Sequence, residues 1–132
     1  MLVAEMQEAH PRPLVGIDAD ALAECIEACL ACAQACTSCA DACLHEEMVA
    51  DLRRCIRLNQ DCADLCDALA RILTRGPDTA PGLLRAAVRA CADACRMCGD
   101  ECATHAEMHE HCRICAEACR RCEQACLALN LG

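Results

Sequence analysis

The sequence predicts an all-α protein, an up-down-up-down four-helix bundle with a cysteine-lined core and a short N-terminal extension. The 132 residues include 18 cysteines and no Phe, Tyr or Trp. Most of the cysteines recur at alternating steps of four and three, which is the spacing of one face of an α-helix. Turn residues and shifts in this register divide the stripes into four segments. The helix face that normally carries Leu and Ile in a bundle core therefore carries thiols.

The first bundle helix is expected to follow an extension over residues 1–17, which contains Pro11, Pro13 and Gly16 and can hold one short helical turn. Asp18 is the expected N-cap, and the helix runs to about Leu44. The twelve-residue step between its last cysteine and the next one is out of register, so the chain must turn near residues 45–47. The stripe of this helix comprises Cys25, Cys29, Cys32, Cys36, Cys39 and Cys43.

The second bundle helix keeps the same register and is ended by Gly76 and Pro77. Its inward positions are Met48, Leu52, Cys55, Asn59, Cys62, Cys66, Leu69 and Leu73. A second stripe on this helix, formed by Leu58, Leu65 and Ile72, contacts the N-terminal extension or serves self-association; the sequence leaves both open. Asn59 is interpreted either as a buried amide with satisfied hydrogen bonds or as an oxygen contact to a metal.

The third helix begins near Pro81 and the fourth follows a slip in the register. The third stripe comprises Cys91, Cys95, Cys98 and Cys102, continued by His105 and His109. The fourth comprises Cys112, Cys115, Cys119, Cys122 and Cys126. The slip predicts a hairpin near residues 105–110, with a bent continuous helix as the alternative because no breaker residue stands there. Four helices of about 22–28 residues with short loops then form a single bundle domain over residues 18–132.

The two ends of such a bundle differ in chemistry. An aliphatic end gathers Leu22, Leu69, Leu73, Leu84, Val88 and Leu129. The opposite end, here called the mouth, gathers Cys43, Met48, His105, Met108, His109, His111 and Cys112. We infer that metal enters at the mouth and passes inward to sulfur. His10 and His45 are interpreted as surface residues, and the sequence does not decide whether Met48 and Met108 contact metal.

Composition excludes several classes of protein. The formal net charge is −9 and the chain lacks a concentrated basic surface, which argues against nucleic-acid binding. The first residues lack the basic and apolar regions of a signal peptide, and no stretch approaches the roughly 20 apolar residues of a membrane span. We therefore expect a cytoplasmic protein with reduced thiols. No catalytic triad, phosphate loop or flavin motif is present, so we do not expect an enzyme.

The stripes favour Cu(I) as the bound metal. A Cu(I) ion that replaces a thiol proton leaves the formal charge unchanged, whereas Zn(II) on four thiolates buries a net charge of about −2 per site. Cysteines four residues apart on a helix have Cβ atoms about 5–6 Å apart, which suits two- and three-coordinate Cu(I). Zinc or general soft-metal sequestration and a thiol redox sensor remain the alternatives, although a sensor needs only a few exposed thiols.

The chain resembles the cytosolic bacterial copper storage proteins over residues 18–129. The most specific portions are C-x3-C-x2-C-x3-C-x2-C-x3-C in the first helix, LRRCIRLNQDCADLC in the second and HEHCRICAEACRRCEQAC in the fourth. The resemblance implies a lumen that stores many Cu(I) ions on thiolates, assembled as a homotetramer. It also implies coordination by His105, His109 and His111 at the open end, and it places Asn59 where the family has an Asn.

Overall fold

The structure is a computed structural model that describes residues 1–131, and this range contains helices but no strands. Helix α1 spans Leu2–Ala9 and α2 spans Ala19–Leu44. A short 3-10 helix, Val49–Leu52, precedes α3 at Arg53–Arg75, and a second one, Gly76–Asp78, follows it. Helix α4 spans Pro81–Thr104 and α5 spans Glu110–Ala128.

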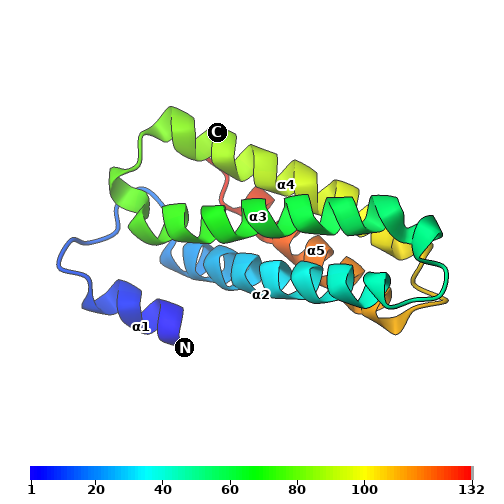
Figure 1. The fold of residues 1–132 in the computed structure, drawn as a ribbon. Coiled ribbons are helices and arrows are strands. Elements are labelled where there is room, and N and C mark those ends of the chain that lie inside the picture. Colours follow the sequence, from blue (N-terminus) through cyan, green and yellow to red (C-terminus); the bar gives the residue numbers. More distant parts are fainter. Residues whose placement is uncertain (132) are drawn as a thin grey trace.

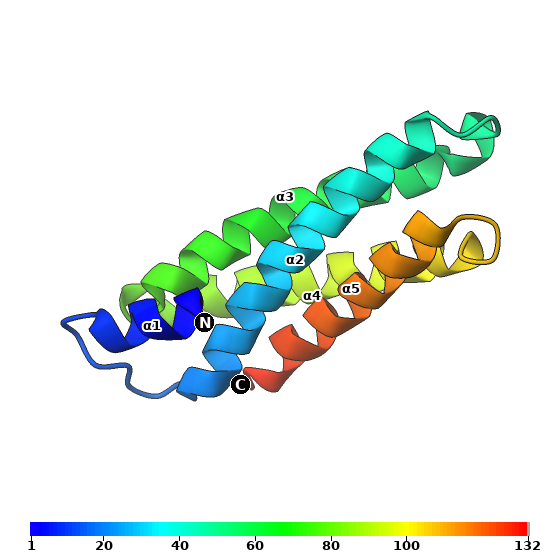
Figure 2. The ribbon, with the colours of Figure 1, turned by 90° about the horizontal axis from the view of Figure 1, so that it is seen from below.

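The four long helices form the predicted up-down-up-down bundle (Figure 1). Helix α2 packs beside α3 and α5, and α4 closes the ring by packing beside the same two helices. The α2–α3 and α4–α5 connections lie together at one end, and the α3–α4 connection lies at the other end with α1 (Figure 2). All residues of the aliphatic end are buried, so this end is sealed by packing.

Local signals set most helix boundaries. The Asp18 carboxylate accepts hydrogen bonds from the backbone N–H of Asp20 at 2.8 Å and of Ala21 at 3.2 Å, which caps α2 as predicted. Pro81 is the first residue of α4. Helix α4 ends at Thr104 and α5 begins at Glu110, so the hairpin that the register slip predicts is confirmed.

Two boundaries differ from the prediction. The residues before Arg53 form a 3-10 turn, so α3 begins later than the register of Met48 suggests. Helix α5 has 19 residues and is shorter than expected, because the hairpin takes up residues 105–109 and Asn130 leaves the helix with a φ of 51°. The inward register is kept in both cases, since every cysteine of these helices is buried.

The N-terminal extension is more ordered than a single turn. Helix α1 has eight residues and packs against α2, and a pocket of about 270 Å³ between them is lined by side chains such as Val3, Met6 and Ile26. Gly16, with a φ of 83°, lets the chain reverse into α2. On α3, Leu58 and Ile72 pack against the core while Leu65 is exposed.

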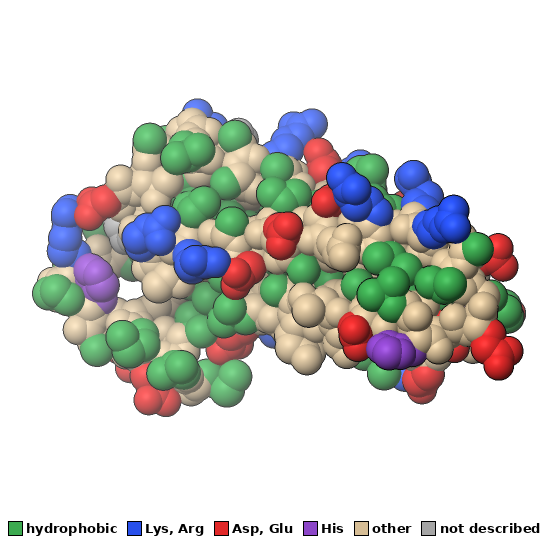
Figure 3. All heavy atoms as spheres, viewed as in Figure 1, with side chains coloured by type: hydrophobic (Ala, Val, Ile, Leu, Met, Phe, Trp, Pro, Cys, Tyr) green, Lys and Arg blue, Asp and Glu red, His purple; other side chains and the backbone are tan. Residues whose placement is uncertain are grey.

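Helix α2 is long and apolar enough to cross a membrane by length and composition alone, which corrects the expectation that no segment approaches a span. Its apolar character comes largely from Cys and Ala, and half of the most apolar window is buried inside the bundle. On the face shown in Figure 3, basic and acidic side chains are interspersed, and the surface is hollowed where α1 meets the bundle.

Candidate metal centre

The cysteines form one continuous column of sulfur along the bundle axis. All 18 are free thiols and all are buried. Each helix contributes thiols from the face that its four-three spacing turns inward, so sulfurs from all four helices meet. Neighbouring Sγ atoms lie 3.6–3.9 Å apart, as in Cys66–Cys91 at 3.6 Å and Cys32–Cys62 at 3.9 Å. These are thiol contacts rather than disulfides, and a metal ion bound between such sulfurs needs only small movements of side chains.

The sulfurs gather into overlapping groups of four whose ligand atoms all lie within 4.8 Å of one another. Cys32, Cys36, Cys119 and Cys122 each belong to two of these groups, so adjacent groups share thiols. The all-cysteine groups include Cys29/Cys91/Cys122/Cys126, Cys32/Cys66/Cys95/Cys122, Cys32/Cys36/Cys62/Cys119 and Cys36/Cys98/Cys115/Cys119. Because thiols are shared, bridging thiolates that join ions of low coordination number fit this arrangement better than a row of separate tetrahedral sites does.

Asn59 is fully buried and lies among the thiols. Its Oδ1 accepts hydrogen bonds from Cys98 at 3.0 Å and from Cys115 at 3.1 Å. Its Nδ2 donates to Cys55 Sγ at 3.5 Å. The amide is therefore satisfied by sulfur on both sides, as the first of the two sequence interpretations requires. The same orientation directs Oδ1 toward two thiols that would bind metal, so the second interpretation is compatible with this geometry.

The remaining cysteines complete the two ends of the column. Near the aliphatic end, Cys25 Sγ lies 3.8 Å from Cys126 Sγ. Near the mouth, Cys55 Sγ lies 3.6 Å from Cys102 Sγ. Burial raises the pKa of the Cys43 thiol to about 11 and also raises the pKa of Cys112. These two thiols are therefore protonated at neutral pH in the metal-free protein, and metal must displace their protons.

His111 is the histidine that the structure brings into the sulfur column. Its Nδ1 lies 3.3 Å from Cys39 Sγ and 3.7 Å from Cys112 Sγ. With Cys43, these residues make a mixed group of three thiols and one imidazole. The ring of His109 stacks on His111 with centroids 5.4 Å apart, and its side chain is buried. The α4–α5 hairpin thus carries two imidazoles over the outermost sulfurs.

The other mouth residues lie farther out. His105 Nε2 lies 2.8 Å from Glu101 Oε2 on the preceding turn of α4, and Arg54 contacts the other oxygen of Glu101 at 3.3 Å. Met48 and Met108 are 38% and 64% exposed. His10 and His45 are exposed, as expected for surface residues.

Sequence reasoning missed the carboxylates of the mouth. Glu46, in the α2–α3 turn, places Oε2 2.9 Å from His111 Nε2 and 3.1 Å from His109 Nδ1. The hydrogen bond with His111 holds the pKa of Glu46 below its usual range. Glu101 precedes His105 by four residues, and this helical spacing could have revealed the pair. Glu46 is separated from His111 by 65 residues, and no local pattern links them.

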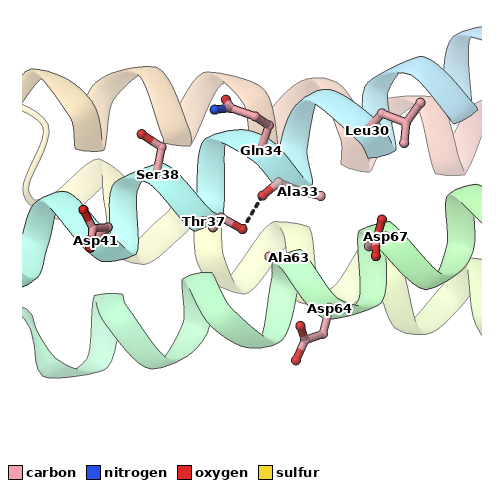
Figure 4. A pocket seen from close by; sticks show the side chains of 9 residues that line it. All are labelled: Leu30, Ala33, Gln34, Thr37, Ser38, Asp41, Ala63, Asp64 and Asp67. Atoms are coloured by element: carbon pink, nitrogen blue, oxygen red, sulfur yellow. Dashed lines mark hydrogen bonds between the residues drawn. The ribbon is translucent and has the colours of Figure 1, made fainter.

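A larger cavity lies away from the sulfur. A surface groove of about 500 Å³ runs between α2 and α3 (Figure 4). Small and acidic side chains line it, including Ala33, Thr37 and Asp64, and none of its lining residues is a cysteine. The Thr37 hydroxyl donates to the backbone carbonyl of Ala33 at 2.8 Å, so the polar group at the centre of the groove is satisfied within α2. The groove is thus separate from the candidate metal centre.

Comparison with known proteins gives consistent matches. The sequence model of the copper storage protein family matches residues 18–130. The copper storage protein Ccsp from Streptomyces lividans, loaded with 10 copper equivalents, is 57% identical with a TM-score of 0.93, covering 96% of each chain. A cytosolic copper storage protein from Streptomyces lividans with five coppers is 61% identical with a TM-score of 0.83, covering 86% of this chain and 94% of that one. The Cu(I)-bound copper storage protein BsCsp3 is 39% identical with a TM-score of 0.70, covering 80% and 93% of the two chains.

Proposed function

Because this chain belongs to the copper storage protein family, we propose that it stores Cu(I) on the thiolates of its bundle core. The observation that carries this function is the column of Sγ atoms along the bundle axis. Many neighbouring sulfurs in it lie 3.6–3.9 Å apart, and adjacent groups of ligand atoms within 4.8 Å of one another share thiols. Bridging thiolates can bind many Cu(I) ions on such a column, with a capacity on the order of one ion per cysteine. Each ion replaces a proton, so the loaded core stays close to neutral.

The ligands in this proposal are the 18 cysteines, the three imidazoles of His105, His109 and His111 at the mouth, and the Asn59 side chain within the column. Three thiols and the His111 Nδ1 within 4.8 Å of one another support a mixed site at the mouth. The orientation of the Asn59 Oδ1 toward Cys98 and Cys115 supports an oxygen contact in the loaded state. Met48 and Met108 are not assigned as ligands, because both are exposed.

We propose that the protein stores copper in the cytosol and does not act as an enzyme. A cytosolic relative and 18 free thiols both suit a reducing compartment. The polar groups of the core are thiols, one amide and the mouth imidazoles, and this set of soft ligands supports metal binding as the role that we propose. We place the store in a single domain over residues 18–132, with residues 1–17 as an extension. The partners that we propose are copper ions and copies of this chain in a homotetramer, with neither nucleic acid nor membrane.

The function is tested by anaerobic titration of the fully reduced protein with Cu(I), with a chromophoric chelator reporting free copper. Uptake approaching one ion per cysteine, with thiolate-to-copper charge-transfer absorption, is the expected result. Saturation at about four ions or fewer would overturn the proposal and would favour the zinc alternative. Recovery of intrahelical disulfides after mild oxidation, with little copper uptake, would instead favour the redox sensor.

The mouth as the port of entry is tested separately. His105→Ala and His109→Ala together should slow both the loading of copper and its removal by a chelator, while the capacity of the column is retained. The matched control is His10→Ala together with His45→Ala, because both of these histidines are exposed. Unchanged loading and removal rates in the mouth variant would show that copper enters elsewhere.

A further inference from the structure

Glu46 joins two parts of the mouth that are distant in sequence. It belongs to the α2–α3 turn, whereas His109 ends the α4–α5 connection and His111 lies in the first turn of α5. A single oxygen, Oε2, contacts both imidazoles, at 3.1 Å from His109 Nδ1 and 2.9 Å from His111 Nε2. The carboxylate is partly buried, and His109 is more than nine-tenths buried. The contact therefore lies between the two connections that close this end of the bundle.

The contact decides which nitrogen of each ring carries hydrogen. A carboxylate can only accept, so the ring nitrogen that faces it must be the N–H nitrogen. In a neutral imidazole the opposite nitrogen then carries the lone pair. That nitrogen is Nδ1 in His111, which lies 3.3 Å from Cys39 Sγ. In His109 it is Nε2, which is buried and has no hydrogen-bond partner within residues 1–131.

An unpartnered lone pair on a buried imidazole is costly unless the site receives a ligand. The His109 Nε2 is one of only two such side-chain atoms within residues 1–131, the other being on Gln7 in α1. The alternative tautomer of His109 would place two lone pairs against each other at 3.1 Å, at Nδ1 and at the Glu46 carboxylate. Glu46 thus holds His109 in a form that leaves Nε2 free to bind a cation.

We propose that Glu46 is a positioning residue that fixes the tautomers and ring orientations of His109 and His111. It thereby selects Nε2 of His109 and Nδ1 of His111 as the atoms that receive Cu(I) at the mouth. A carboxylate hydrogen-bonded to the second nitrogen of a metal-binding imidazole is a general device for orienting the ring and raising its basicity. The part of this inference that concerns copper rests on the proposed function, whereas the part that concerns tautomers does not.

The tautomer is measured by long-range 1H–15N NMR of the imidazoles in the reduced, metal-free protein at about pH 8. Free imidazole side chains favour the Nε2–H form, so the expected Nδ1–H form of His109 is diagnostic of Glu46. In Glu46→Ala, His109 should revert to Nε2–H. The matched control Glu47→Ala removes the adjacent, exposed carboxylate and should leave both rings unchanged. An Nε2–H form of His109 in the native protein, or no change in Glu46→Ala, would overturn the proposal.

Transfer of copper from the mouth to a chelator separates a positioning role of Glu46 from a role that only holds the two connections together. Glu46→Ala should weaken copper at the mouth by about 10- to 100-fold while the total capacity stays within an ion or two of native. In a His109→Ala/His111→Ala background, Glu46→Ala should add no further loss, because it acts through those rings. An additive loss, or transfer equal to that of Glu47→Ala, would contradict the proposal.

The controls separate the possible failures. Glu46→Leu also removes the acceptor and serves as the second variant if Glu46→Ala does not fold; His109 should then revert to the Nε2–H form. An Nδ1–H His109 in Glu46→Leu would therefore also contradict the proposal. Absence of copper uptake in every variant would reject the storage function, while the NMR result would still decide whether Glu46 sets the tautomers.

Discussion

The two ends of the bundle use the same helices for different purposes. At the aliphatic end, Leu22, Leu69, Leu73, Leu84, Val88 and Leu129 are buried against one another. At the mouth, thiols meet imidazoles, carboxylates and partly exposed methionines, and the structure is held by directional contacts such as Glu46–His111. The aliphatic end therefore contributes apolar packing, whereas the mouth, which is the proposed port of entry, contributes metal-binding groups. A core of small thiols without aromatic residues can tolerate a polar end, because the other end supplies much of the apolar packing.

The largest effect should come from a cavity at the aliphatic end. Leu73→Ala should lower the free energy of unfolding of the metal-free protein by about 2–5 kcal/mol, because Leu73 is fully buried and its site cannot collapse completely. Urea denaturation under reducing conditions measures this. Met108→Ala at the mouth is the control and should change stability by less than about 0.5 kcal/mol, since Met108 is 64% exposed. Equal losses at the two ends would show that the aliphatic end contributes no more to stability than the mouth does.

A smaller effect is expected in the middle of the column. Asn59→Ala removes the acceptor of the Cys98 and Cys115 thiols and the donor to Cys55, which should cost about 1–3 kcal/mol of stability in the metal-free protein. The same denaturation experiment tests it. Asn59→Asp keeps the oxygen and should retain more stability than Asn59→Ala below the pKa of the new carboxyl. An unchanged stability in Asn59→Ala would show that the thiols do not form effective hydrogen bonds with the Asn59 amide.

Alkaline pH should weaken the mouth of the metal-free protein. The pKa of Cys43 is raised to about 11 in the folded state from an unfolded value of 9.0, so the folded protein holds a proton that the unfolded chain loses in this range. The stabilisation is therefore complete below the unfolded pKa and is lost as pH rises toward the folded pKa. The melting temperature should fall by a few degrees between about pH 8 and about pH 10.

The control for this pH effect is Cys43→Ser, which removes one ionising group of nearly the same size. Its melting temperature should decline less steeply with pH than that of the native protein. The residues of the aliphatic end do not titrate, so Leu73→Ala should keep the native pH dependence. A melting temperature that rises with pH would contradict the sign derived from Cys43.

The smallest effect concerns a surface clasp between α5 and α2. Arg121 donates two hydrogen bonds to the Glu24 carboxylate, at 3.0 and 2.8 Å, and this contact holds the pKa of Glu24 below its usual range. Glu24→Gln should cost about 0.5 kcal/mol or less, because both side chains are close to half exposed. The difference should vanish as pH falls through the folded pKa of Glu24, where the native carboxylate is also lost. A difference that grows in acid would refute this.

Periodicity explains how much of the fold the sequence could predict. The four-three spacing identifies every cysteine as inward-facing, and all are buried. The register slip after His109 predicts the hairpin between α4 and α5, which the structure confirms. Such patterns are informative because successive residues of a helix are rotated by a fixed angle, so the residues of an inward face can be identified from a single sequence. The ligand roles of the cysteines, the histidines and Asn59 remain predictions.

The features that sequence reasoning missed depend on contacts outside this periodicity. Glu46 lies in a turn, and its two histidine partners become neighbours only when the hairpins meet. The length of α1 was underestimated because its burial depends on α2 rather than on a stripe of its own. Helix α2 also resembles a membrane span more than expected, since cysteine adds to its hydropathy while serving as a candidate ligand. Tertiary partners, rather than local propensity, decide these points.

The sealed aliphatic end has a consequence for the order of turnover. With the mouth as the proposed single port, the column operates on a last-in, first-out basis, so the ions stored earliest should be the last to leave. Loading half of the capacity with one copper isotope and the rest with another tests this, because a chelator should first recover the isotope that was added second. Recovery of both isotopes in equal proportion would show that ions exchange along the column faster than they depart. The copper bound most recently would therefore be the first to be released only where ions keep their order along the sulfur column.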